Sequence, residues 1–166
     1  KCDLYLTDVE TCGYRCIKPG WSVPSWLKAI AVNDPPFNAL IDTGALVTGM
    51  SNKQVAEYLL GAGLPWCEGV VFLDELDRKM ILIRATGRVQ ELAQCGITPD
   101  KRFAFYDQVH TTGMDIKHSL NATAVLTLGK DMVFRDYVQG AFRMRGLGKG
   151  QTIELFVIPE VLSLIK

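Results

Sequence analysis

From residue 37 onward, short apolar runs alternate with segments of helical periodicity, and this alternation constrains the fold more than any other feature. The runs are apolar at consecutive positions, as is typical of strands that are buried on both faces. A helical pattern that Ser51 caps extends to about Leu60 between the first two runs. We therefore predict an α/β domain with a mostly parallel sheet flanked by helices on both faces. The predicted strands are 37–41, 70–73, 79–84, 102–106, 124–128 and 152–158.

The remaining segments complete this prediction. A polar turn at Glu75–Arg78 joins the strands 70–73 and 79–84 as a hairpin. Further helices are expected at 88–94, 132–145 and 161–165. Prolines punctuate residues 1–36, which we expect to form a leader or linker that packs on the domain, with one short helix near Trp26–Val32. The domain proper is expected to span residues 37–166.

The charge balance limits the classes of partner. The 18 basic and 18 acidic residues cancel, so a nucleic-acid site would have to be a local basic patch. No apolar run approaches the ~20 residues that a membrane span requires. The chain begins at Lys1 and not at Met, so we expect it to be a piece of a longer protein.

The five cysteines bear on compartment and metal. Their odd number and scattered spacing argue against a disulfide framework and favour an intracellular protein, cytoplasmic or nuclear. Cys12 and Cys16 have no second Cys or His pair to complete a tetrahedral zinc site, so we expect no metal there.

The segment 137–151 is the most informative one for chemistry. Its pattern is that of an amphipathic helix that ends with Arg143 and Arg145. A glycine-rich turn with Lys149 follows and leads directly into a predicted strand. Guanidinium groups bind phosphate oxygens and stabilise the charge that develops in phosphoryl transfer. The alternative is a solvated basic helix end that favours the helix dipole.

This segment resembles the arginine-finger motif of superfamily-two helicases, in which a Gln and an Arg pair precede a glycine-rich exit into a strand. The loop at 109–116, with Gly113 and Asp115, resembles the motif that precedes it in those proteins. The resemblance covers residues 37–158. It implies a RecA-like C-terminal lobe that closes over ATP and Mg²⁺ held by a preceding RecA-like lobe.

In this family the Arg of the finger reaches the γ-phosphate, which the resemblance assigns to Arg143, with Arg145 and Lys149 as further phosphate contacts. Gly113, Asp115 and Gln139 would organise the loop around the nucleotide. The chain departs from the family pattern at Gly146 and Thr112, where arginines are usual, and at Asp107, where a Thr often contacts nucleic acid. These departures bear on nucleic-acid contact and on ATPase competence.

The strings 105–117 and 134–151 also resemble a region of very large eukaryotic proteins catalogued as predicted ubiquitinyl hydrolases. That likeness raises the hypothesis of a thiol peptidase, with Cys95 as nucleophile, His110 or His118 as base and Asp115 or Asn121 as orienting group. A buried structural role for Cys95 is the competing interpretation.

Two acidic motifs point to different chemistry. Asp42-Thr43-Gly44 is similar to the active-site turn of retroviral-type aspartic peptidases, which would need a homodimer to supply the second Asp. The run 70–75 ends in Asp74-Glu75 and has the form of a Walker B strand, although no phosphate-binding Gly-x-x-x-x-Gly-Lys-Ser/Thr accompanies it.

The leading hypothesis is a helicase-like nucleoside-triphosphatase lobe that is inactive alone. The competing hypotheses are a peptidase and a degenerate lobe that serves as scaffold.

Overall fold

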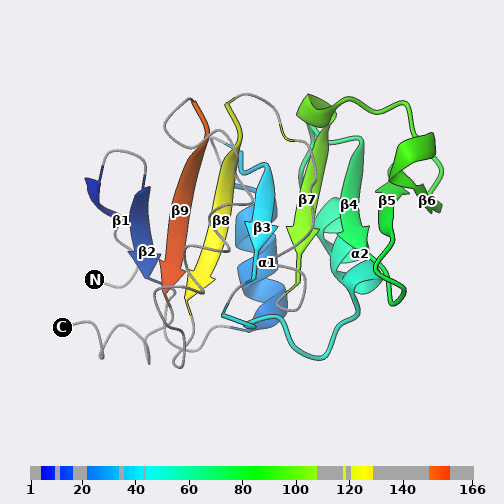
Figure 1. Cartoon of the computed structure of the whole chain (residues 1–166). Helices are drawn as coiled ribbons and strands as arrows, with labels where there is room; N and C mark the ends of the chain where they lie inside the picture. Colours follow the sequence, from blue (N-terminus) through cyan, green and yellow to red (C-terminus); the bar gives the residue numbers. More distant parts are fainter. Residues whose placement is uncertain are drawn as a thin grey trace.

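The computed structural model of the chain describes residues 5–9, 12–16, 22–33, 36–42, 44–107, 118, 121–128 and 150–157. Within these ranges, nine strands form one sheet in the order β1-β2-β9-β8-β3-β7-β4-β5-β6 (Figure 1). The strands are β1 (Tyr5–Val9), β2 (Cys12–Cys16), β3 (Ala39–Ile41), β4 (Gly69–Leu73), β5 (Lys79–Ile83), β6 (Val89–Glu91), β7 (Arg102–Tyr106), β8 (Thr123–Leu128) and β9 (Thr152–Val157).

The central strands are parallel. Every neighbouring pair from β2 through β9, β8, β3 and β7 to β4 is parallel, whereas β1 and the β4–β5–β6 meander pair antiparallel at the two ends. The predicted mostly parallel α/β sheet is therefore confirmed. The carboxyl ends of the parallel strands lie along one edge, the lower edge in Figure 1.

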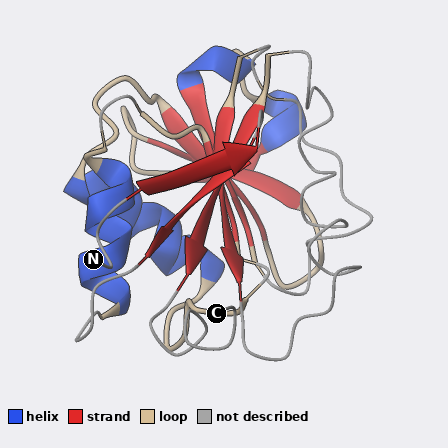
Figure 2. Ribbon diagram, turned by 90° about the vertical axis from the view of Figure 1, so that its left-hand side faces the viewer, coloured by secondary structure: helices blue, strands red, loops and turns tan. Residues whose placement is uncertain are grey.

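Two helices cover one face of the sheet, behind the strands in Figure 1 and to the left in Figure 2. They are α1 (Val23–Ala31) and α2 (Asn52–Ala62), and each begins with a serine capping box, at Ser22 and Ser51. Their apolar sides share a core with alternate strand residues such as Leu40 and Phe103. The helices expected at 132–145 and 161–165 lie outside the described residues.

The other face of the sheet is also buried. Ala39, Ile41, Ala104 and Leu126 are at most 1% exposed there and form a second apolar cluster. This burial on both faces explains why the central strands are apolar at consecutive positions.

The N-terminal segment belongs to the same sheet and core. β2 pairs with β9 over five residues, and the aromatic ring of Trp26 in α1 packs on Phe156 of β9. The segment 1–36, which we expected to be a leader or linker that packs on the domain, thus contributes two strands and a helix to its sheet and core. The short helix expected at 26–32 is confirmed and begins three residues earlier, because Ser22 caps it.

The prediction of a helix at 88–94 is wrong. Val89–Glu91 instead forms β6, paired antiparallel with β5, and a single turn of 3₁₀ helix, η1 (Leu92–Gln94), follows. Gly87 has a φ of +68° in the turn between β5 and β6, a conformation that glycine adopts without strain. This tight turn returns the chain to the sheet edge. A second 3₁₀ turn, η2 (Pro99–Lys101), precedes β7.

Candidate functional site

Asp42 stands at the carboxyl end of β3 and organises the loop that leads to α2. Its two carboxylate oxygens accept hydrogen bonds from the backbone N–H groups of Leu46 and Val47, both at 2.9 Å. The hydroxyl of Thr127 on β8 donates a third, also at 2.9 Å, and accepts one from the N–H of Gly44 at 2.8 Å. The carboxylate therefore ties the loop to the neighbouring strand.

The environment of Asp42 suits a structural carboxylate. The residue is 2% exposed, and this burial raises the pKa of the Asp42 carboxyl above its ordinary value, although the three donors lower it in part. A peptidase aspartate must face a water and a substrate, and it must share a proton with a second carboxylate. Here both oxygens are occupied by bonds within the fold, so the geometry gives no support to the aspartic-peptidase hypothesis.

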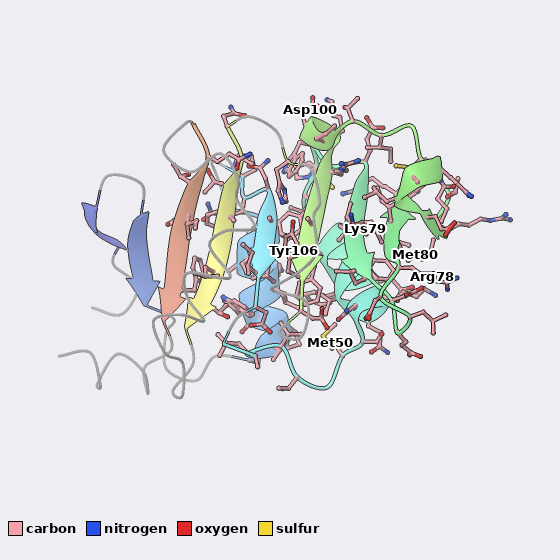
Figure 3. The ribbon with its side chains drawn as sticks, viewed as in Figure 1. Met50, Arg78, Lys79, Met80, Asp100 and Tyr106 are labelled. Atoms are coloured by element: carbon pink, nitrogen blue, oxygen red, sulfur yellow. The ribbon has the colours of Figure 1, made fainter. Side chains whose placement is uncertain are left out.

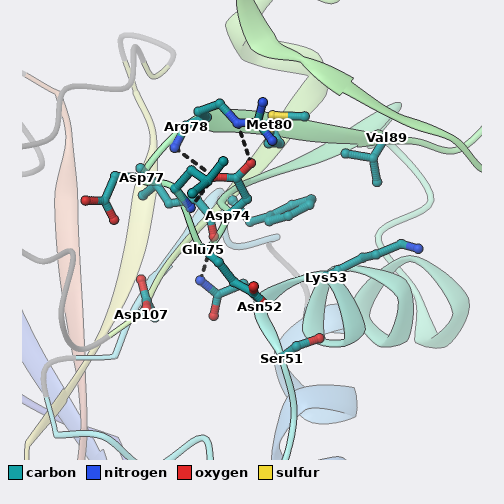
Figure 4. Close-up of a pocket in the computed structure, with 13 residues that line it drawn as sticks. Ser51, Asn52, Lys53, Asp74, Glu75, Asp77, Arg78, Met80, Val89 and Asp107 are labelled. Carbon is teal, nitrogen blue, oxygen red and sulfur yellow. Dashed lines mark hydrogen bonds and ion pairs between the residues drawn. The ribbon is translucent and has the colours of Figure 1, made fainter.

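A groove of about 1180 Å³ lies beside this loop at the same edge of the sheet (Figure 4). The first residues of α2, the turn between β4 and β5, and Asp107 after β7 surround it. The side-chain amide of Asn52 donates to the carbonyl oxygen of Leu73 at 2.8 Å and so fixes the start of α2 against the end of β4. The residues that line the groove are Ser51, Asn52, Lys53, Phe72, Leu73, Asp74, Glu75, Leu76, Asp77, Arg78, Met80, Val89 and Asp107.

Asp74 fixes the conformation of the β4–β5 turn. Its carboxylate accepts hydrogen bonds from the N–H groups of Leu76 and Arg78 at 2.9 Å and from Nε of Arg78 at 2.8 Å. These hydrogen bonds hold the pKa of the Asp74 carboxyl below its ordinary value. The hairpin predicted at 70–84 is confirmed, and the contacts of Asp74 are those of a turn residue, which favours the hairpin over the Walker B interpretation.

The residues predicted for a thiol-peptidase site are only partly within the described residues. Cys95 is half-buried and packs against the second cluster, and it stands at the carboxyl end of η1, where a helix does not activate a thiol. A ring nitrogen of His118 lies 2.7 Å from the hydroxyl of Tyr106, a residue that is 0% exposed. Among the described residues, no hydrogen bond joins Cys95 to His118. Asn121 is exposed, whereas His110 and Asp115 lie outside the described residues.

The residues predicted to contact a nucleotide, Gly113, Asp115, Gln139, Arg143, Arg145 and Lys149, lie outside the described residues. The structure does fix where their two segments leave the sheet. β7 and β8 both pair with β3, one on each side, and both end at the carboxyl edge. The residues that follow β7 and those that follow β8 therefore start on either side of the Asp42 loop.

The sequence did not single out Thr127, Asn52 or Lys53 as residues of this edge. Thr127 has one visible signal, since it is the one polar residue in the predicted apolar run 124–128. In the structure it is 0% exposed. Its partner becomes evident only from the register, in which Leu126 pairs with Ile41 and thus brings Thr127 beside Asp42. Asn52 and Lys53 belong to an ordinary polar helix start and carry no signal of their own.

No protein-family model matches the chain, and neither the curated proteins nor the solved structures contain a match to it. In the described part of the chain, no group of three or more His, Cys, Asp or Glu side chains is arranged to hold a metal ion. None of the described helices is long and apolar enough to cross a membrane.

Proposed function

We propose that this chain is the second lobe of a helicase-like nucleoside-triphosphatase module within a larger protein. In this proposal the lobe is inactive alone and completes a site for ATP and Mg²⁺ that the preceding RecA-like lobe holds. Arg143 would stabilise the charge on the γ-phosphate during transfer, as a guanidinium supplied from outside a nucleotide site does. Arg145 and Lys149 would add phosphate contacts, and Gly113, Asp115 and Gln139 would organise the loop.

One observation carries the proposal. The two segments that resemble helicase motifs follow β7 and β8, and these strands flank β3 and end at the same edge as the Asp42 loop. In open parallel sheets, ligands bind beyond the carboxyl ends of the strands. The topology thus starts both motif-bearing segments at the edge where a nucleotide would bind.

The proposal is tested by complementation. The chain, the segment that precedes it in the parent protein, and the two together are assayed for phosphate release from ATP in the presence of Mg²⁺. We expect release only when both parts are present, with each part alone as the matched control. Equal hydrolysis by the chain alone would contradict the proposal, and absence of hydrolysis in the joined protein would favour a degenerate scaffold lobe.

A further inference from the structure

The tip of the β4–β5 hairpin presents a large apolar side chain to solvent. Leu76 is 70% exposed, and among the described residues only Val32 is another large hydrophobic side chain with comparable exposure. Leu76 lies on the rim of the groove at the carboxyl edge, and the side chains of Phe72, Met80 and Val89 provide an apolar lining beside it. An isolated exposed leucine is common, but one that continues an apolar groove extends a surface that can bind a partner.

The tip is held in one conformation before any partner arrives. Besides the three hydrogen bonds to the carboxylate of Asp74, the N–H of Asp77 donates to the carbonyl oxygen of Asp74 at 3.0 Å. The φ of Asp77 is +62°, which completes the tight turn. A rigid tip loses little conformational entropy when it is covered, so it suits a binding role.

Among the described residues that line the groove, acidic side chains outnumber basic ones. The described part of the lining contains four carboxylates, on Asp74, Glu75, Asp77 and Asp107, and two cations, on Lys53 and Arg78. Arg78 is already paired with Asp74 at 2.8 Å. The whole chain has no net charge, so this excess of negative charge is local. In Figure 4, Asp77 and Asp107 lie on one side of the groove, and Lys53 and Val89 on the other.

From this combination we infer that the groove docks a basic segment of a partner protein that carries an apolar anchor residue. The anchor would pack on Leu76, Met80 and Val89, and Lys or Arg side chains would face Glu75, Asp77 and Asp107. Charge complementarity of this kind steers association and selects partners. A free phosphate or nucleotide is disfavoured in this groove because the carboxylates repel it. The inference does not depend on the nucleotide proposal.

The test uses a short fluorescein-labelled peptide of Lys and Leu in a Ser-Gly background, titrated with the full chain and followed by fluorescence anisotropy. A peptide with Glu in place of Lys is the control ligand. We expect the Lys peptide to bind at low salt, with weaker binding as salt screens the charges, and the Glu peptide not to bind.

Two variants of the groove locate the binding. Glu75→Lys combined with Asp77→Asn should weaken it about tenfold, and Asn tolerates the left-handed backbone at this position. Leu76→Ser should weaken it about fivefold. The matched control is Glu68→Lys combined with Asp100→Asn, the same charge change on exposed residues at the opposite edge of the sheet (Asp100 is labelled in Figure 3).

Three results would overturn the inference: no binding of the Lys peptide at low salt, equal weakening by the control pair, or displacement of the peptide by Mg-ATP. The substituted residues are exposed, and an unchanged near-ultraviolet circular dichroism spectrum verifies that each variant is folded. Failure of ATP hydrolysis in the joined protein would leave this inference standing, because the peptide titration measures a different property.

Discussion

The carboxylate of Asp42 and the hydroxyl of Thr127, 85 positions apart in the chain, form a buried hydrogen bond of 2.9 Å. The bond joins the end of β3 to the end of β8, and the same hydroxyl accepts the N–H of Gly44. The Asp42 loop is therefore held by its own carboxylate on one side and by the neighbouring strand on the other. This pair sets the geometry of the edge at which the proposed nucleotide-facing segments begin.

Thr127→Val should lower the free energy of unfolding by about 1–3 kcal/mol, because it leaves the N–H of Gly44 without its acceptor and removes a donor to a buried carboxylate. Thr127→Ser keeps the hydroxyl and should recover most of the loss. Urea denaturation of the two variants checks this. Equal loss in both would show that the methyl group, and not the hydrogen bond, stabilises the site.

Gly63 and Gly61 should respond oppositely to alanine. A Cβ at Gly63 would lie 2.6 Å from the carbonyl oxygen of Ala31, so Gly63→Ala must push α2 away from the end of α1 and should cost about 1–3 kcal/mol. A Cβ at Gly61 meets nothing within 4 Å, and Gly61→Ala within α2 should stabilise the protein by up to about 1 kcal/mol. Thermal unfolding compares the two variants. A change of stability with the same sign in both would contradict the close packing of Gly63 on the end of α1.

Arg84 closes the carboxyl end of α2. Its guanidinium donates to the carbonyl oxygens of Leu60, Gly63, Leu64 and Cys67 at 2.7–3.1 Å. Arg84→Ala should therefore reduce the free energy of unfolding by about 1–3 kcal/mol. Arg88→Ala, at an exposed arginine in the next turn, is the matched control and should change it by less than ~0.5 kcal/mol. Chemical denaturation compares the two variants. Equal free energies of unfolding would contradict a stabilising role for the four hydrogen bonds of Arg84.

His118 should make the protein less stable in mild acid. Burial and then the charge of Arg102 lower the pKa of His118 from 6.5 to about 4. Between these values the unfolded chain binds the proton and the folded chain does not, so stability is full above pH 6.5 and falls as the pH drops toward 4. The loss amounts to at most about 3 kcal/mol.

His118→Gln should flatten this dependence, as denaturation at pH 7.5 and pH 5 would show. The same pH profile in the variant would assign the acid sensitivity to other groups. A titration of the His118 ring by NMR gives a direct check, since an apparent pKa near 6.5 would contradict its burial against Tyr106.

The parts of the fold that depend on local patterns were predictable. The strands buried on both faces, the capping box at Ser51 and the polar turn after Leu73 each leave a signal within a few residues. The N-terminal strands leave no such signal, because β2 is defined by its pairing with β9, about 140 positions away. The three-residue β6 was predicted as a helix, since a strand so short is determined by its neighbour β5 and not by its own periodicity.

In the candidate site, too, some features follow from local sequence and others from pairing between distant segments. Asp42 was noticed because Asp-Thr-Gly is a visible motif, but its role depends on Thr127, which only the sheet register brings close. The groove combines the start of α2, a hairpin tip and Asp107, three segments that no sequence motif connects. The carboxyl edge, beyond which open parallel sheets generally bind ligands, can be identified from the sequence. The contacts that shape this edge follow from tertiary pairing.

The most direct test of the proposed lobe is Arg143→Ala in the protein that contains both this chain and the lobe that precedes it. Arg135→Ala, at an arginine outside the proposed finger, is the matched control. We expect kcat for ATP hydrolysis to fall by ~10³-fold or more in the Arg143 variant and to stay near the parent value in the control. Unchanged hydrolysis after Arg143→Ala would contradict the proposed role of this lobe.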